Sequence, residues 1–346
     1  MRKLAQIAIS LGLTLLIGVI LYRGVPDWAQ AWRVMIQGRP VLLLAGFGFV
    51  MLHMLLRALR WGVLLSPIKA GISVKSLFSL TLVKYVVNAI PPRAGEVAAS
   101  VVLAKKENVP VASVIAASLL ERILDMLTVV VIFGFYIIFF AHLYPPNSEH
   151  GKQIFFTIQG YSVKGFLVLC LGLFLLSVLL RSLKWLNSMP TKIQHLLRPF
   201  LEGFRGLQQG GVLFQAAFLS TAIWLTITLQ LWCLVQGYLD GFPFRGALFL
   251  MAITVVGVAI PTPGGVGGFQ FFMNLALLNF FSQYLSAEDP HSQVAGISNG
   301  CYITSMVPVM LIGLIFMNRE GLSLSRLSKM SDQSLTNANQ PSCQQR

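Results

Sequence analysis

Long apolar stretches recur from one end of this chain to the other, and they constrain its fold more than any other feature. A helix rises about 1.5 Å per residue, so about 20 apolar residues cross a hydrocarbon core about 30 Å thick. Only 11% of the 346 residues are charged, against about 25% in ordinary soluble domains. The sequence therefore predicts an all-α polytopic membrane protein. We expect six full spans, at residues 4–22, 41–56, 111–143, 164–180, 212–236 and 293–317.

The stretch 84–103, KYVVNAIPPRAGEVAASVVL, interrupts the apolar pattern. Pro91 and Pro92 cannot donate backbone hydrogen bonds, so the helix must break here. The limbs on either side, 73–90 and 93–104, would be about 27 and 18 Å long as helices, and the second is too short to cross. A re-entrant hairpin on the cytoplasmic side fits both lengths. Its candidate headgroup-binding residues are Lys84, Asn88, Arg93, Gly95 and Glu96.

The longest apolar segment carries the charged sequence ASLLERILD. Glu121 and Asp125 share one helix face at a spacing of four residues, and Arg122 lies within reach of Asp125. Each charge facing lipid would cost about 2.5 to 3.5 kcal/mol, so such residues normally pair with one another or mark a pathway. We expect these three residues to pair with the charges of the first motif.

A second break, PTPGGVGG at 261–268, separates the limbs 244–260 and 266–285. The tripeptide Ala-Ile-Pro at 89–91 recurs at 259–261, and Gly95 recurs as Gly265 at the same spacing. Three full spans lie between the two breaks, so the second hairpin is expected to enter from the opposite side, as in an inverted repeat. Pro263, Gly264 and Gly265 are candidates for contact with a lipid phosphate. The glycines equally suit tight helix association, and both interpretations stay open.

The distribution of basic residues predicts the orientation. Seventeen lysines and arginines fall in segments assigned to the cytoplasm, including those of RALRW at 57–61, and six fall outside. This bias places both termini in the cytoplasm, with RALRW at the end of the second span. Residues 191–207 are expected to form an amphipathic helix on the membrane surface. The polar composition of residues 319–346 predicts a disordered cytoplasmic tail.

Taken together, RALRW, PPRAGE, ASLLERILD and IPTPGGVGGFQ resemble the motifs of the lysylphosphatidylglycerol synthase transmembrane-region family. The resemblance extends over residues 4–317, so residues 1–318 are expected to form one flippase-like domain. The family pattern is matched by Arg93, Gly95 and Glu96, by Glu121, Arg122 and Asp125, and by Pro263, Gly264 and Gly265. The acidic residue that often follows the last turn in the family is here Gln270, which puts a charge-dependent role there in doubt.

The resemblance implies a flippase or transporter that moves an anionic or headgroup-modified lipid, a phospholipid or an isoprenoid-linked carrier, between leaflets of the bacterial inner membrane. Arg93 and Lys84 would then engage the lipid phosphate, and Arg122 would neutralise the acids. Glu96, Glu121 and Asp125 would position the basic groups or take up protons. The aminoacyl-transferring domain of the synthase is soluble and C-terminal, and this sequence does not contain it. The resemblance therefore does not imply lipid synthesis, and we expect no enzyme activity, cofactor or metal. The expected partners are anionic membrane lipids, and no nucleic acid.

Other functional hypotheses remain open. The chain could be an intramembrane enzyme acting on a lipid-linked phosphate or sugar, since paired acids can activate water or bind a divalent metal. It could instead be an accessory subunit of envelope-biosynthesis enzymes, or its charges could only hold helices together. Monomer and homodimer are both compatible with the sequence. The four cysteines, Cys170, Cys233, Cys301 and Cys343, lack metal-ligand spacing, and no Walker-type loop for direct ATP hydrolysis is present.

Overall fold

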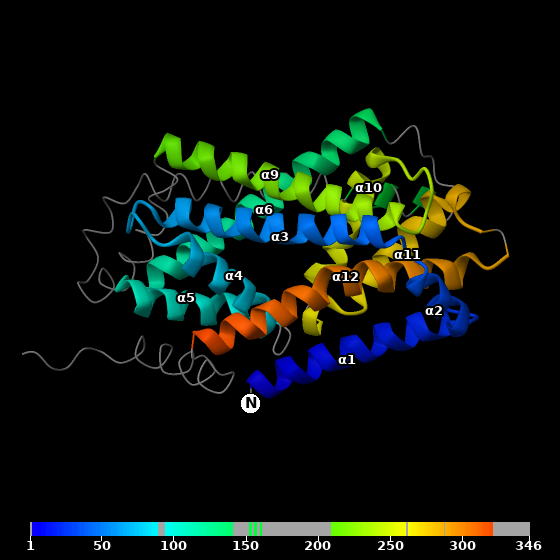
Figure 1. The fold of residues 1–346 in the computed structure, drawn as a ribbon, viewed down its shortest axis with the longest axis horizontal. Coiled ribbons are helices and arrows are strands. Elements are labelled where there is room, and N and C mark those ends of the chain that lie inside the picture. Colours follow the sequence, from blue (N-terminus) through cyan, green and yellow to red (C-terminus); the bar gives the residue numbers. More distant parts are fainter. Residues whose placement is uncertain are drawn as a thin grey trace, which may run out of the picture.

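The computed structural model describes residues 2–88, 94–140, 152–153, 156–157, 160, 209–260, 262–286 and 288–320, with side chains from residue 14 onward. All regular secondary structure in these residues is helical (Figure 1). The α-helices are α1 (Arg2–Arg23), α2 (Trp28–Ile36), α3 (Pro40–Leu65), α4 (Val74–Val87), α5 (Ala94–Glu107), α6 (Val111–Phe139), α9 (Gly210–Gln236), α10 (Phe244–Ala259), α11 (Gly268–Phe280) and α12 (Pro290–Arg319).

Four helices are long and apolar enough to cross a bilayer, namely α3, α6, α9 and α12. They contain 26 to 30 residues, which gives lengths of about 39 to 45 Å. The predicted spans at 41–56, 111–143, 212–236 and 293–317 are therefore confirmed as helices. The predicted first span, 4–22, lies within α1. The predicted span at 164–180, the amphipathic helix at 191–207 and the tail from residue 321 lie outside the described residues.

Proline and aspartate mark where several helices begin. Pro40 and Pro290 are the first residues of α3 and α12, where the missing N–H is not needed. Asp27 accepts hydrogen bonds from the backbone N–H of Ala29 and Gln30 and so caps α2. Asp289 caps α12 in the same way through Ser292. These local signals separate helices that the apolar pattern alone would run together.

The predicted end of the second span at RALRW is wrong. Helix α3 continues through Arg57, Arg60 and Trp61 to Leu65, and both Arg60 and Trp61 are fully buried. This arginine and this tryptophan are therefore interior residues of the bundle and do not mark its boundary. Without Arg57 and Arg60, fifteen of the seventeen basic residues remain in segments assigned to the cytoplasm, against six outside. The predicted orientation is therefore unchanged.

The two predicted breaks are present as two pairs of short helices. Helices α4 and α5 contain 14 residues each, and α10 and α11 contain 16 and 13, so each is only about 20 to 24 Å long. The members of each pair contact one another. In Figure 1, α4 and α5 lie toward one end of the long axis and α10 and α11 toward the other. Helix α11 ends at Phe280, earlier than the predicted limb, and a 3₁₀ turn, Ser282–Tyr284, follows it.

Glycine allows the two helices of each pair to touch through their backbones. A Cβ atom on Gly95 at the start of α5 would collide with the carbonyl oxygen of Lys84 on α4. In the second pair, a Cβ on Gly257 would collide with the carbonyl oxygen of Gly268, and the reverse also holds. Gly268 at the start of α11 therefore makes the backbone contact that Gly95 makes at the start of α5. The repeated spacing in the sequence instead matches Gly95 with Gly265. Gly264 has a φ of 62°, which explains why the turn between α10 and α11 requires glycine.

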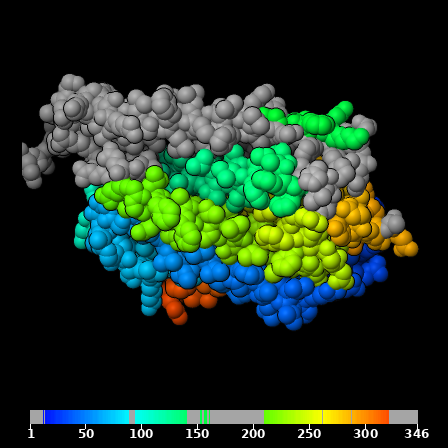
Figure 2. Space-filling view, turned by 90° about the horizontal axis from the view of Figure 1, so that it is seen from above, coloured from blue at the N-terminus to red at the C-terminus, as the bar shows by residue number. Residues whose placement is uncertain are grey.

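Each pair of short helices has its own apolar core. One cluster of buried side chains joins α4 and α5 to α3 and the first half of α6. The other joins α10 and α11 to α9, α12 and the second half of α6. Figure 2 shows α9 and α6 side by side on one face of the molecule. Both pairs of short helices therefore pack against the long helices, and α6 contributes to both apolar cores.

We predict that Gly257→Ala lowers the free energy of unfolding by about 1 to 3 kcal/mol, because the new methyl group forces the α10 and α11 backbones apart. Thermal unfolding of the purified protein in detergent measures the effect. Gly134→Ala in α6 is the matched control, since a Cβ there meets nothing within 4 Å. The control should be neutral or stabilising by up to about 1 kcal/mol through helix propensity. Equal destabilisation by both variants would contradict the contact.

Candidate functional site

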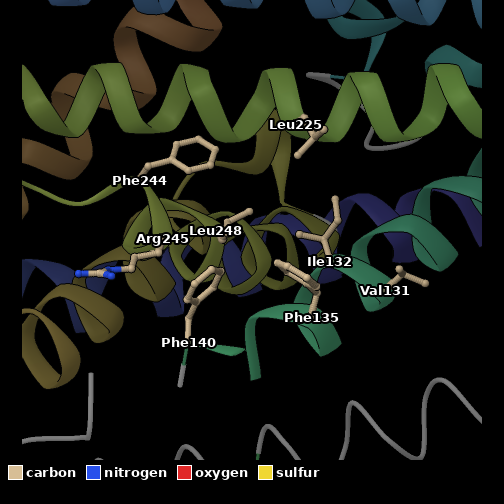
Figure 3. A pocket seen from close by; sticks show the side chains of 8 residues that line it. All are labelled: Val131, Ile132, Phe135, Phe140, Leu225, Phe244, Arg245 and Leu248. Carbon is tan, nitrogen blue, oxygen red and sulfur yellow. The ribbon is translucent and has the colours of Figure 1, made fainter. Parts of the chain in front are cut away.

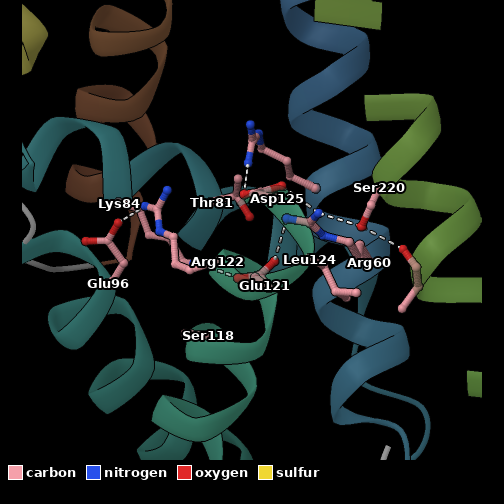
Figure 4. Close-up of polar contacts among 12 residues, drawn as sticks. Arg60, Thr81, Lys84, Glu96, Ser118, Glu121, Arg122, Leu124, Asp125 and Ser220 are labelled. Carbon is pink, nitrogen blue, oxygen red and sulfur yellow. Dashed lines mark hydrogen bonds and ion pairs between the residues drawn. The ribbon is translucent and has the colours of Figure 1, made fainter. Parts of the chain in front are cut away.

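Two buried carboxylates on α6 form the centre of the candidate site (Figure 4). Glu121 is 7% exposed and Asp125 is 6% exposed, and they lie one turn apart on the same helix face, as the sequence predicts. Carboxylates at this depth need cationic partners, because unpaired buried charges are costly. Their partners come from α3, α4 and α9.

Asp125 is held by three donors. Arg60 donates from Nη1 to Oδ1 at 2.7 Å, and Arg57 donates from Nη1 to Oδ2 at 3.2 Å. The indole Nε1 of Trp224 on α9 also donates to Oδ1, at 3.1 Å. The same Arg60 guanidinium donates to Ser220 Oγ at 2.8 Å. Asp125 therefore connects α6 to both α3 and α9.

Glu121 links α6 to α4. Its Oε2 accepts a hydrogen bond from Lys84 Nζ at 3.1 Å, and its Oε1 lies 3.8 Å from Arg60 Nη2. The Lys84 ammonium also lies 3.9 Å from the ring centroid of Trp61, which is a cation–π distance. Lys84 is thus held by a carboxylate and an aromatic face at the same time.

A third ion pair, between Glu96 and Arg122, lies at the edge of this cluster. The Arg122 side chain is 53% exposed and that of Glu96 is 18% exposed, so this pair is much more accessible than the other two. Asn88 donates from Nδ2 to Glu96 Oε1 at 3.4 Å, and its Oδ1 accepts from the N–H of Gly95 at 2.8 Å. Asn88 therefore ties the end of α4 to the start of α5. Glu96 Oε2 is buried and has no hydrogen-bond partner among the described residues.

The predicted pairing between the two motifs is present, through Lys84 with Glu121 and Glu96 with Arg122. Sequence reasoning missed Arg57 and Arg60, which were placed at the membrane boundary. The available signal was the apolar sequence WGVLL that follows them, which continues the helical pattern. Arg93, a predicted phosphate ligand, lies outside the described residues. The described cluster contains four cations, Arg57, Arg60, Lys84 and Arg122, and three anions, Glu96, Glu121 and Asp125, so one positive charge is in excess.

The Pro263–Gly265 turn has different chemistry from the charged cluster. Tyr302 of α12 donates from Oη to the Gly264 carbonyl oxygen at 2.8 Å. Gln270 Oε1 accepts from the N–H of Gly267 at 2.8 Å, and its Nε2 donates to Asn299 Oδ1 at 3.4 Å. Gln270 therefore caps the start of α11, and this role requires a hydrogen-bond acceptor and no charge. The described contacts do not bring Pro263, Gly264 and Gly265 together with Glu121 and Asp125.

These features define a multi-pass helical membrane protein with two pairs of short helices and a buried network of ion pairs. The chain belongs to the family of the lysylphosphatidylglycerol synthase transmembrane region, whose model matches residues 4–287. No individually curated protein matches the chain significantly. The family match ends before α12, although α12 contacts α2, α4 and α11 and so completes the described bundle.

We predict that Asp125→Asn destabilises the protein by about 3 to 5 kcal/mol, because Arg57 and Arg60 would keep buried charges without their partner. Thermal unfolding in detergent measures the change. Asp240→Asn is the matched control: Asp240 pairs with Arg39 at an exposed site, where such a pair contributes at most about 1 kcal/mol. Similar small shifts for both variants would show that the network contributes little to stability.

Proposed function

We propose that this protein moves an anionic or headgroup-modified lipid between the leaflets of a bilayer. The observation that carries the proposal is the excess positive charge of a buried cluster that opens to the surface at Arg122. An anionic headgroup would compensate that charge, and ionisable groups inside membranes commonly mark substrate pathways. Membership of a family of lipid-synthase transmembrane regions supports lipid as the substrate class.

The members of the cluster have different roles in this proposal. Arg57 and Arg60 position Asp125, and Lys84 is held between Glu121 and Trp61. Arg122 is the exchangeable cation, because its side chain is half exposed and a lipid phosphate can approach it from the surface. Arg93 remains a predicted second phosphate ligand.

We further propose the membrane arrangement. Helices α1, α3, α6, α9 and α12, with the segment 164–180, are six full spans, and α4–α5 and α10–α11 are re-entrant hairpins of opposite orientation. Both termini lie in the cytoplasm, and the membrane is the bacterial cytoplasmic membrane. The short lengths of the paired helices and the distribution of basic residues support this arrangement.

We also propose that the cluster binds and does not catalyse. Glu121 and Asp125 would have to activate water or bind a metal in an intramembrane hydrolase. Both carboxylates instead accept hydrogen bonds from cationic side chains, so fewer of their lone pairs are available to a water or a metal.

Leaflet-resolved movement of labelled phosphatidylglycerol in proteoliposomes tests the proposal. We expect Arg122→Gln to slow this movement about tenfold or more, the loss of roughly 1.4 kcal/mol of charge-assisted binding. Phosphatidylcholine, whose headgroup carries no net charge, should be affected much less. Arg39→Gln, which removes an exposed arginine far from the cluster in sequence, is the control and should behave as wild type.

Two results would count against the proposal. Wild-type protein that leaves every labelled lipid in its original leaflet, with and without a proton gradient, would remove the flippase interpretation. Release of phosphate or sugar from a lipid-linked substrate under the same conditions would favour the intramembrane enzyme instead.

A further inference from the structure

An apolar groove lies between α6, α9 and α10 (Figure 3). Its volume is about 350 Å³, which is within the range of small-ligand sites. Ile132 and Leu248 are buried and form its floor, and Leu225 of α9 contributes to one wall. All of the lining residues except Arg245 are apolar, so the groove suits a hydrocarbon chain.

The groove opens on the outer surface of the bundle. Val131 is 54% exposed, Phe135 is 49% exposed and Leu225 is 42% exposed. In a membrane such surfaces are covered by lipid tails, and a concave one retains a tail longer than a flat one because more of the tail is in contact. A lipid acyl chain is therefore the occupant that fits the groove.

One end of the groove carries the features of a membrane interface. Arg245 lies in the first turn of α10, and in Figure 3 its guanidinium extends away from the apolar side chains. Phe244 beside it packs edge-to-face against Trp232 at a centroid distance of 5.9 Å, and the Trp232 indole donates to the Phe242 carbonyl oxygen. Tryptophan and arginine at a helix end are typical of the headgroup region. A chain in the groove would thus have its headgroup at Arg245.

We propose that this groove binds one acyl chain of an anionic phospholipid, with the lipid phosphate at Arg245. The inference rests on the proposed lipid transport and orientation, which place Arg245 at the external leaflet. Helices α10 and α4 lie toward opposite ends of the long axis (Figure 1). The Arg245 end of the groove, at the start of α10, is therefore the place where the headgroup is held in the leaflet opposite α4.

Photolabelling of the full-length protein in nanodiscs tests the groove directly. The probe is phosphatidylglycerol with a photoreactive diazirine in one acyl chain, and labelled residues are identified by mass spectrometry. We expect labels to concentrate on α6 and α10 around Phe135 and Leu248. Leu225→Trp should fill the groove and remove most of this labelling. Leu314→Trp on α12 is the matched control, because Leu314 has a similar exposure of 43% and lies outside the groove.

Arg245→Gln separates tail binding from headgroup binding. We expect it to reduce labelling by phosphatidylglycerol about fivefold, the effect of roughly 1 kcal/mol for one arginine near a membrane surface. Labelling by the matching diacylglycerol probe, which carries no phosphate, should not change. Equal loss for both probes would overturn the assignment of the phosphate to Arg245.

Other outcomes distinguish this inference from the proposed function. Even labelling of all exposed apolar residues on α6, α9 and α12 would overturn the groove as a site. So would crosslinking of Val131→Cys to cysteines introduced at 164–180, because that segment would then occupy the groove. Lipid movement that persists with no groove labelling defeats this inference alone, whereas groove labelling without lipid movement defeats only the transport proposal.

Discussion

The structure depends on the need to compensate two buried carboxylates on α6. Either Glu121 or Asp125 without partners would cost several kcal/mol in a low-dielectric interior. Their compensation requires Arg60 from α3, Lys84 from α4 and Trp224 from α9, so one helix face fixes the positions of three neighbouring helices. Apolar side chains in a bilayer do not supply this specificity, because lipid tails are as apolar as leucine.

Backbone contact at glycine supplies a second, independent constraint. The α4–α5 and α10–α11 pairs both rely on it, yet one is surrounded by charges and the other by amide and hydroxyl groups. Helices α6 and α12 each contact both pairs. In α12, residues before and after Pro308 contact different pairs of short helices. Tyr302 contacts the Gly264 turn between α10 and α11, and Gly313 packs against the Leu82 backbone of α4. The two ends are thus mechanically connected through continuous helices.

Local patterns predicted much of this fold from the sequence. Apolar length located α3, α6, α9 and α12, and proline and glycine located both breaks. The cost of buried charge predicted pairing between the two motifs, and the Lys84–Glu121 pair is one instance of it. The apolar sequence after Arg57 and Arg60 indicates that the helix continues, but it does not identify the residues with which the two arginines pair. Their partners, Asp125 and Ser220, lie 65 to 160 residues away. The capping role of Gln270 likewise depends on a backbone N–H whose orientation only the folded turn defines.

A site that moves an anionic lipid must bind its headgroup and then release it. The three groups of ion pairs differ in the free-energy cost of exchanging their carboxylate for another anion. Displacing Asp125 from Arg57 and Arg60, or Glu121 from Lys84, would expose buried charges at a cost of several kcal/mol. In the Glu96–Arg122 pair the arginine side chain is half exposed, so a phosphate can approach it from the surface without the exposure of a second buried cation. The same network therefore contains a rigid part, which aligns the helices, and an exchangeable part at its edge, where an anionic headgroup can compete.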